Sequence, residues 1–343
     1  MSTLRAGLSG CGPLAAAALA ALRRGADCDV VAAHDDDDRA LAAWRRGFPV
    51  GVATTDYRAL LATGIDFVVL AGPVGQRREQ VCEAAEQAVP VLAAAPWAAS
   101  TADAEAMVAA CQQAELRFGV LVPGFGDPVL DQLRTMLADG WFGGLVAVHT
   151  TSGDDELLQQ PPAAGDARLA AFAFDGDPVL GLLAADLHLL AWLCGRRCRR
   201  VAAVAQKGLL PLPHDRIGGT LELSGGALAT CTVSRTQRGR ALSIVGTDGS
   251  AHYADGALVL RGCRRREGPA FTYGAIDTTV VLAADELRRD PAPATLDPVG
   301  RFARWLGDED GYPCPGDQAL QDLRTLAALH RALQSGRSEA VAE

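Results

Sequence analysis

Two glycines near the start of the chain have the spacing of a dinucleotide-binding loop. Gly10 and Gly12 follow the apolar run Leu4–Ser9, which predicts a buried strand, and they precede an alanine-rich stretch that predicts a helix ending at Gly25. Glycines at such a turn let the backbone approach a pyrophosphate, which the free amides and the dipole of the helix then bind. The G-x-G-x-x-A pattern predicts that a cofactor contacts Gly10, Cys11, Gly12, Pro13 and Leu14.

An acidic run, His34-Asp35-Asp36-Asp37-Asp38, follows the predicted strand Asp29–Ala33. A carboxylate at the tip of this strand can accept hydrogen bonds from the adenosine ribose and repels the 2′-phosphate of NADP. Alternatively, the aspartates complement the dipole of the predicted helix Arg39–Arg46. Both roles are compatible. His34 occupies the usual acidic position and Asp35 comes one residue later, so the expected cofactor is NAD or NADP, with NAD slightly favoured.

His188 is the candidate for proton transfer. It lies in the predicted helix Leu180–Leu193, which is otherwise built mainly from leucine and alanine. In one interpretation it acts as an acid or base, and in the other it is a packed histidine bonded to a carbonyl. Asp186 is two residues away, so on a helix the two side chains diverge by roughly 200° and a direct pair is not expected. The candidate partners of His188 are Asp186, Asp175, Asp177 and Arg77.

The other reactive residue types form no catalytic or metal-binding pattern. The nine cysteines are scattered, and the closest pair, Cys194 and Cys198, lies four residues apart at a predicted helix end. We therefore expect reduced thiols and no metal site. The single lysine, Lys207, follows the helix of His188 in a predicted strand, and we expect it on the surface.

The elements that position these groups begin with alternating strands and helices over the first 120 residues. Strands and helices in this order stack into a doubly wound parallel sheet, with ligands at the carboxyl ends of the strands. Residues that follow two of the strands, Gly72, Pro73, Ala94 and Pro96, are therefore further candidates for cofactor binding. The predicted strands are Leu4–Ser9, Asp29–Ala33, Ile65–Ala71 and Val89–Ala93, and the predicted helices are Arg39–Arg46, Asp56–Leu61, Glu79–Ala88 and Ser100–Glu115.

After residue 120 the pattern predicts helices Val129–Leu137 and Leu180–Leu193, an antiparallel meander and a final helix, Gln318–Leu333. Turn signals separate its elements, at Asp175–Pro178, Gly225-Gly226, Asp248-Gly249 and Asp255-Gly256. The expected fold class is α/β, with a Rossmann domain over 1–120 and a C-terminal α/β domain with an open, mainly antiparallel sheet over 121–343. The predicted strands of the meander are Leu145–Thr151, Gly219–Leu223, Ala227–Ser234, Ala241–Val245, Ala251–Tyr253 and Ala257–Leu260.

Composition excludes some classes of partner. The net charge of −9 argues against nucleic acid, because binding a duplex needs a basic surface. The arginine clusters Arg196–Arg200 and Arg264–Arg266 are local exceptions that we interpret as solvated helix ends or hairpin rims, with phosphate binding as the alternative. The stretch Pro291–Pro298 predicts a linker. There is no apolar run of about 20 residues, so we expect no membrane partner and a cytoplasmic protein.

Several local phrases, in their order along the chain, resemble the Gfo/Idh/MocA family of NAD(P)-dependent oxidoreductases from about Leu4 to Arg337. The resemblance implies a homo-oligomer assembled through the C-terminal sheet. It also implies hydride transfer between a nicotinamide and a sugar, polyol or related alcohol, with a Glu-Lys-Pro lysine and a helix histidine handling the hydroxyl proton. The phrases are Gly10-Cys11-Gly12, Asp56-Tyr57 with Leu60-Leu61, Asp66–Ala71 before Pro73, Val91-Leu92 before Pro96, Asp139–Gly143 and Val245–Ser250.

The chain departs from this family at its polar positions. The Glu-Lys-Pro motif is replaced by Ala94-Ala95-Pro96, and a methyl group at Ala95 cannot carry a proton. Arg77 stands where the family commonly has histidine, and Gly124-Phe125-Gly126 lacks an arginine that often precedes Asp127-Pro128. The helix motif Asp-x-Gly-x-His is replaced by Ala184–His188, in which only His188 is retained and Asp186 occupies the glycine position.

Three hypotheses about function follow from these departures. The first is an oxidoreductase of a sugar, polyol or related small-molecule alcohol with His188, Arg77 and Asp186 as atypical catalytic residues, or a lyase or hydrolase using transient oxidation. The second is a catalytically inactive family member that serves as a nucleotide-sensing or partner-binding subunit, for example in a hetero-oligomer with an active paralogue. In the third hypothesis the cleft no longer binds nucleotide, and the protein retains only the assembly of subunits through its open sheet.

Overall fold

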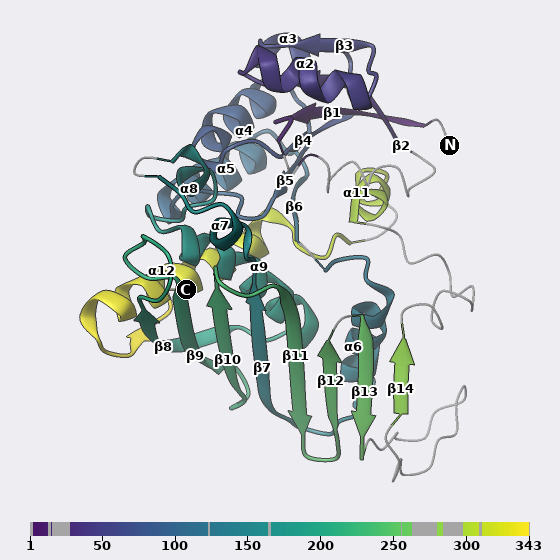
Figure 1. Ribbon diagram of the computed structural model, residues 1–343. Coiled ribbons are helices and arrows are strands. Elements are labelled where there is room, and N and C mark those ends of the chain that lie inside the picture. Colours follow the sequence, from purple (N-terminus) through teal and green to yellow (C-terminus); the bar gives the residue numbers. More distant parts are fainter. Residues whose placement is uncertain are drawn as a thin grey trace. The chain divides into compact units, whose positions relative to one another are not determined.

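The fold was described from a computed structural model of the chain (Figure 1). By backbone contacts the chain forms two compact units. The first comprises 1–125, 167–178 and 296–323, and the second comprises 126–166, 179–295 and 324–343. The units differ from the two continuous ranges expected from the sequence, because 167–178 and 296–323 return to the first unit. The structure describes residues 3–12, 15, 28–122, 124–163, 166–254, 256–262, 280–283, 298–308 and 311–342.

The first unit contains a six-stranded sheet in which every pairing is parallel. The strand order is β3-β2-β1-β4-β5-β6, which is the order of a doubly wound dinucleotide-binding fold. All four residues of β4 and all four of β5 are buried, as expected for strands covered on both faces. The strands are β1 (Leu4–Ser9), β2 (Cys28–His34), β3 (Val52–Thr54), β4 (Phe67–Leu70), β5 (Val91–Ala94) and β6 (Phe118–Leu121).

Side-chain caps mark the first residues of α2, α3 and α5. The Asp56 carboxylate accepts from the amides of Arg58 and Ala59, and the Ser100 hydroxyl accepts from the amide of Asp103. Helices α4 and α5 lie side by side (Figure 1). The helices are α2 (Asp38–Gly47), α3 (Tyr57–Leu61), η1 (Val74–Gln76), α4 (Arg77–Glu86) and α5 (Thr101–Gln113).

Two later segments complete the first unit. One contains α8 (Ala167–Ala171) and the turn Phe174–Asp177, in which Phe174 and Asp177 exchange backbone hydrogen bonds, as predicted for this turn. The other contains α11 (Pro298–Leu306) and Tyr312, whose hydroxyl donates to the carbonyl of Val120. The predicted linker Pro291–Pro298 lies outside the described residues except for Pro298, the first residue of α11.

The second unit contains a nine-stranded sheet, of which seven neighbouring strand pairs are antiparallel and one is parallel. The strand order is β14-β13-β12-β11-β7-β10-β9-β8-β15 (Figure 1). The predicted open, mainly antiparallel sheet is confirmed, but the simple meander is wrong. β7 lies between β10 and β11 and pairs with β10 in parallel, because strands far apart in the sequence pair here. The strands are β7 (Leu145–Gly153), β8 (Cys198–Gln206), β9 (Arg216–Leu223), β10 (Leu228–Ser234), β11 (Gly239–Gly246), β12 (Ser250–Ala254), β13 (Ala257–Arg261), β14 (Val280–Ala283) and β15 (Glu339–Ala340).

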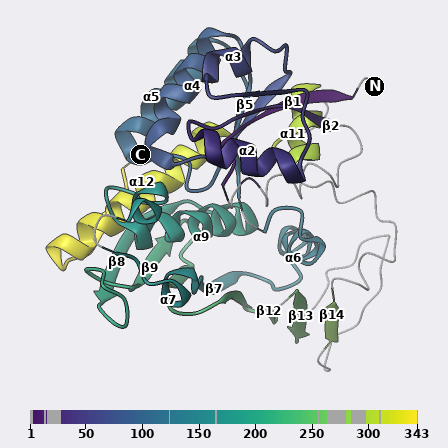
Figure 2. The same cartoon turned by 45° about the horizontal axis from the view of Figure 1, so that its top comes forward.

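Helices α6 (Pro128–Ala138) and α9 (Pro178–Cys194) lie on one face of this sheet (Figure 2). The remaining helices are α7 (Glu156–Gln159) and α12 (Gly316–Ser335), and the unit boundary falls within α12. The turns Gly225-Gly226 and Asp248-Gly249 connect β9 to β10 and β11 to β12, as predicted; Asp255 lies outside the described residues.

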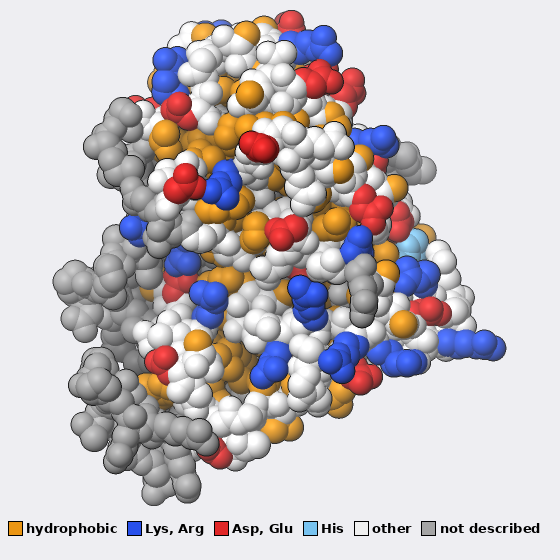
Figure 3. Space-filling model, turned by 180° about the vertical axis from the view of Figure 1, so that it is seen from behind, with side chains coloured by type: hydrophobic (Ala, Val, Ile, Leu, Met, Phe, Trp, Pro, Cys, Tyr) orange, Lys and Arg blue, Asp and Glu red, His pale blue; other side chains and the backbone are white. Residues whose placement is uncertain are grey.

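Two surface features bear on partners. No helix among the described residues is both long and apolar enough to cross a membrane. Basic and acidic side chains are interspersed on the face shown in Figure 3. The arginines of the cluster Arg196–Arg200 are exposed, as expected for solvated side chains, and Arg264–Arg266 lies outside the described residues.

Candidate functional site

Gly10 and Gly12 form the turn between β1 and the next helical residue, Ala15. Gly10 has φ +93°, and a Cβ atom there would fall on the backbone of Gly72, so only glycine fits. A Cβ atom on Gly12 would meet nothing within 4 Å, which leaves space for a ligand to approach the backbone. Pro13 and Leu14, also predicted to contact the cofactor, lie outside the described residues.

The carboxylates of Asp35, Asp36 and Asp37 each have a structural partner. Asp35 accepts from the Cys11 amide at 2.7 Å and from the Asp37 amide at 2.9 Å, and so connects the strand tip to the glycine loop. Asp36 accepts from the amide group of Gln76 at 2.7 Å. Asp37 caps α2, and Asp38 lies in its first turn, where its charge complements the helix dipole. The helix-dipole interpretation thus applies to the last two aspartates, and Asp35 is the carboxylate joined to the predicted phosphate loop.

His34 is buried at the end of β2 and lies in a chain of polar contacts. Its Nδ1 is 2.9 Å from the hydroxyl of Ser9, which in turn accepts from the side-chain amide of Gln80 at 3.0 Å. Its Nε2 is 3.1 Å from Asp36. The ring thus lies between the Ser9 hydroxyl and the Asp36 carboxylate. His34 therefore holds the ends of β1 and β2 together beneath the acidic tip, and its contact with a cofactor stays a prediction.

The Cys11 thiol is an unreactive group in this loop. Burial, together with the negative charge of Asp35, raises its pKa to about 12. The thiol therefore stays protonated near neutral pH and is not a nucleophile.

Arg77, the first residue of α4, is completely buried at the carboxyl ends of β4 and β5. Its Nε and Nη2 donate to the carbonyl of Gly72 at 3.2 and 2.7 Å, and its Nη1 donates to the carbonyls of Ala94 and Pro96. Burial lowers the pKa of the guanidinium to about 9, so it remains charged at neutral pH. Arg77 thus binds together the residues predicted near the cofactor, and a direct catalytic role for it stays a prediction.

The Ala94-Ala95-Pro96 segment continues β5 without any titratable side chain. The Ala95 amide donates to the carbonyl of Leu121 at 2.9 Å, and both alanines are buried. Pro73 caps η1 and is exposed, whereas Gly72 is buried beneath Gly10. Lys207, the only lysine of the chain, is exposed directly after β8, as expected for a surface residue.

In the second unit, Asp186 and His188 extend from α9. Asp186 accepts from the Ser152 hydroxyl on β7 and from Nη2 of Arg240 on β11 at 3.0 Å. Burial raises the pKa of Asp186, and Arg240 and Ser152 partly offset the effect. These contacts attach α9 to the sheet and support a positioning role; a direct catalytic role for Asp186 stays a prediction.

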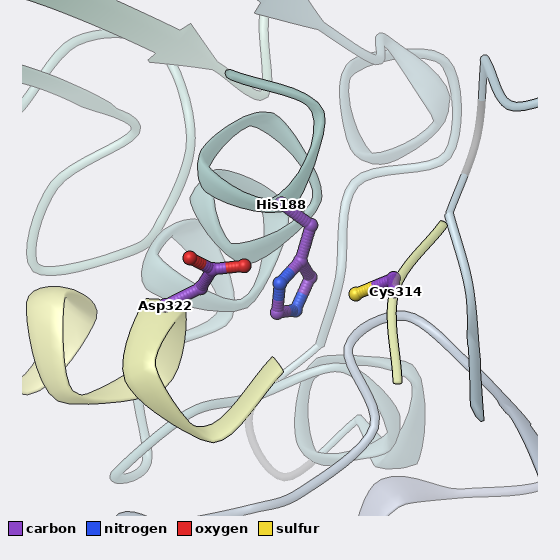
Figure 4. A group of neighbouring side chains, drawn as sticks. All are labelled: His188, Cys314 and Asp322. Atoms are coloured by element: carbon purple, nitrogen blue, oxygen red, sulfur yellow. The ribbon is translucent and has the colours of Figure 1, made fainter. Parts of the chain in front are cut away.

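His188 is also buried, and Figure 4 shows its ring projecting from α9. Figure 4 also labels Cys314 and Asp322, which belong to the first unit. Burial raises the pKa of the Cys314 thiol well above its usual value, so it is protonated at neutral pH.

The residues present fit a dinucleotide. The open space at Gly12 would let a pyrophosphate approach the backbone. The Asp35 carboxylate is bonded to the neighbouring Cys11 amide and could accept hydrogen bonds from ribose hydroxyls. Sequence reasoning missed Ser9, Gln80, Gln76, Ser152 and Arg240, because an isolated polar residue carries no periodic signal. A polar residue at the end of an otherwise apolar strand, as with Ser9, is the signal that could have found one of them.

Both parts of the chain match family models of known oxidoreductases. Residues 4–122 match the model of an oxidoreductase family with an NAD-binding Rossmann fold, and 130–252 match that of the Gfo/Idh/MocA C-terminal domain. Together these ranges cover more than half of the chain.

One curated relative and two solved structures illustrate the similarity. D-apiose dehydrogenase of Paraburkholderia graminis is 33% identical over 137 residues, which are 40% of this chain and 36% of that protein. An oxidoreductase from Agrobacterium radiobacter, solved with NAD+, L-tartaric acid and magnesium, has a TM-score of 0.80 at 20% identity and 99% coverage of both chains. The WlbA dehydrogenase from Bordetella pertussis, solved with NADH and UDP-GlcNAcA, has a TM-score of 0.80 at 19% identity, with 100% of this chain and 99% of that chain covered. At these identities the two structures show a shared fold.

Proposed function

The chain belongs to the Gfo/Idh/MocA family of oxidoreductases, and from this premise we propose that it is an NAD-dependent oxidoreductase of a sugar, polyol or related alcohol. The observation that carries the proposal is the open space at Gly12 beside the Asp35 contact to the Cys11 amide. Gly10 fixes the tight turn, and Gly12 leaves the backbone of the loop open to a phosphate.

The chain's own residues would bind the cofactor through its backbone and its acidic tip. The Gly12 amide and the amides of the helix that the sequence predicts after it would bind the pyrophosphate. Asp35, with Asp36 beside it, would accept from the adenosine ribose and repel a 2′-phosphate, which favours NAD over NADP. Bound at these positions, the nicotinamide would supply the acceptor or donor of hydride.

Proton handling at the substrate hydroxyl would fall to His188, as the family resemblance implies. A lysine cannot contribute from the Ala95 position, and Arg77 is held by three backbone carbonyls. The D-apiose dehydrogenase similarity and the sugar nucleotide in the WlbA structure support a sugar or polyol as the substrate class.

Titration calorimetry with NADH, then NADPH, tests the binding step. We expect micromolar NADH binding and weaker NADPH binding. Gly12→Ala places a methyl group in the open space beside the loop backbone and should weaken NADH binding at least about tenfold. Gly47→Ala is the matched control, because a Cβ atom there also meets nothing within 4 Å and the residue lies at the end of α2. Absence of NADH binding at millimolar concentration would reject the proposal.

Turnover is tested by incubating the protein with NAD+ and a panel of sugars and polyols and following NADH absorbance. His188→Ala should lower turnover about a hundredfold or more while leaving NADH binding intact. The control is His149→Ala, because His149 is exposed on β7 and bonds only to Thr230 in the described structure. Equal turnover of both variants would remove His188 from the mechanism.

A specific observation favours a second candidate, a catalytically inactive subunit that senses nucleotide or binds a partner. The buried Ala94-Ala95 segment offers no group for proton transfer. In that case NADH binds, no member of the panel is oxidised, and the tagged protein copurifies from its source with a paralogue that carries an intact Glu-Lys-Pro motif.

A further inference from the structure

Arg77 is a buried cation without an acidic partner among the described residues. Its hydrogen bonds go to the backbone carbonyls of Gly72, Ala94 and Pro96. Burial is the single cause that lowers its pKa, so no described carboxylate is close enough to offset the loss of hydration. Buried charges in proteins are normally paired, because an unpaired charge in a low dielectric is costly.

The charge lies where a doubly wound sheet binds its ligand. Gly72 follows β4, and Ala94 and Pro96 end and follow β5, so the guanidinium spans the carboxyl ends of two neighbouring parallel strands. Successive strands are added on one side of β1 up to β3 and on its other side from β4 onward. Ligands of this fold bind in the crevice between β1 and β4, where this direction changes. Gly72 lies against Gly10 at the same edge, and Arg77 donates to the Gly72 carbonyl. Gly72 therefore contacts both Arg77 and the predicted cofactor loop.

A fixed positive charge at this edge acts differently on the two oxidation states of a nicotinamide. The oxidised ring carries a positive charge and the reduced ring is neutral. Repulsion in a poorly hydrated site therefore weakens binding of the oxidised form only. The lost Glu-Lys pair would have been neutral overall, whereas Ala94-Ala95 with Arg77 leaves a net positive charge.

We propose that Arg77 is an electrostatic determinant of cofactor oxidation state, which makes the protein bind NADH more tightly than NAD+. The inference rests on the proposed function, because it needs the nicotinamide at this edge of the sheet. By the thermodynamic cycle, tighter NADH binding raises the reduction potential of the bound couple. A tenfold preference corresponds to about 30 mV for this two-electron couple. Bound NAD+ is then a stronger oxidant, which favours the alcohol-to-carbonyl direction and slow release of NADH.

Calorimetry of the full chain with NADH, NAD+ and ADP-ribose tests the inference. ADP-ribose lacks the nicotinamide and reports on the glycine loop alone. We expect NADH to bind about tenfold or more tightly than NAD+ at pH 7. Arg77→Gln should bring the ratio close to one, whereas Arg77→Lys, which keeps the charge, should retain most of it. All variants should bind ADP-ribose within about twofold of each other.

Arg78→Gln is the matched control on the same helix. Arg78 is exposed and pairs with Asp103 at 3.2 Å, so its charge is screened and its loss should not change the ratio. Equal NADH and NAD+ affinities in the unchanged protein would overturn the inference, even if both Arg77 variants failed to fold. An equal loss of the preference for NADH over NAD+ in Arg77→Gln and Arg77→Lys would also overturn the inference. Failure of ADP-ribose and both dinucleotides to bind would instead reject the proposed function.

Discussion

At the scale of single residues, the same substitution should destabilise the protein at Gly10 and leave its stability nearly unchanged at Gly12. Gly10→Ala forces a side chain into φ +93° and onto the backbone of Gly72, so it should lower the free energy of unfolding by about 2 kcal/mol or more. Gly12→Ala should change it by less than about 1 kcal/mol. Urea denaturation followed by circular dichroism measures both. Equal stability of the two variants would mean that the Gly10 turn relaxes around a methyl group.

The predictability of the site also differs from residue to residue. Asp35 could be proposed as a candidate ribose ligand because strand, turn and acidic residue follow one another along the chain. Its bond to the Cys11 amide was not predictable, since it joins residues 24 apart. Likewise, the sequence motif places Arg77 after Pro73 but says nothing of its burial or of the carbonyls that surround it. Those contacts depend on how β4 and β5 pair.

At the scale of elements, the cap of α5 should contribute measurably to stability. Ser100→Ala removes the hydroxyl that accepts from the Asp103 amide, and it should lower the free energy of unfolding by about 1 kcal/mol. Thr101→Ala is the control at the next position, because the Thr101 hydroxyl has no hydrogen-bond partner in the described structure. Thermal unfolding compares the two. A larger loss at Thr101 would contradict the assignment of the cap.

The attachment of α9 to the sheet should depend on pH through Asp186. Burial raises the pKa of this carboxyl above its unfolded value, so the folded protein takes up the proton first as pH falls. Ionised Asp186 therefore costs stability above its folded pKa, and the cost disappears below about pH 4, where both states are protonated. The stability of Asp186→Asn relative to the unchanged protein should consequently rise from pH 4 to pH 8.

Arg240→Met tests the same attachment of α9 from the partner of Asp186. It leaves Asp186 without its cation and should lower the free energy of unfolding by about 3 kcal/mol at neutral pH. Denaturant titrations at several pH values measure both variants. A stability difference between Asp186→Asn and the unchanged protein that is constant across this range would show that Asp186 titrates as in the unfolded chain.

Elements with a strong local pattern were predictable, and those defined by pairing were not. β1 has the predicted bounds, Leu4–Ser9, because its apolar run ends at a glycine turn. β6 and β15 were missed because they are short strands whose place is set by neighbours distant in sequence. The parallel pairing of β7 with β10 was missed for the same reason: hairpin turns predict only sequential antiparallel partners.

At the scale of the whole molecule, the uncovered face of the second sheet is the expected site of homo-oligomer assembly. Paired register places Ala147, Leu228 and Val245 in one row on this face, and Leu228 and Val245 are among the exposed large apolar residues. Exposed apolar side chains on a sheet face are typical of interaction surfaces. No local pattern could reveal this row, since its members come from three strands that are distant in sequence.

Leu228→Arg should therefore break a homo-oligomer that forms through this face, because the oligomer would bury two charges without partners. We expect the unchanged protein to sediment as a dimer or larger assembly at micromolar concentration and the variant to sediment as a monomer. Val52→Arg is the control, since Val52 is similarly exposed on β3 in the other unit. Analytical ultracentrifugation distinguishes the outcomes. A monomer before any substitution would leave this face to a different partner, and the hetero-oligomer with a paralogue would become the expected assembly.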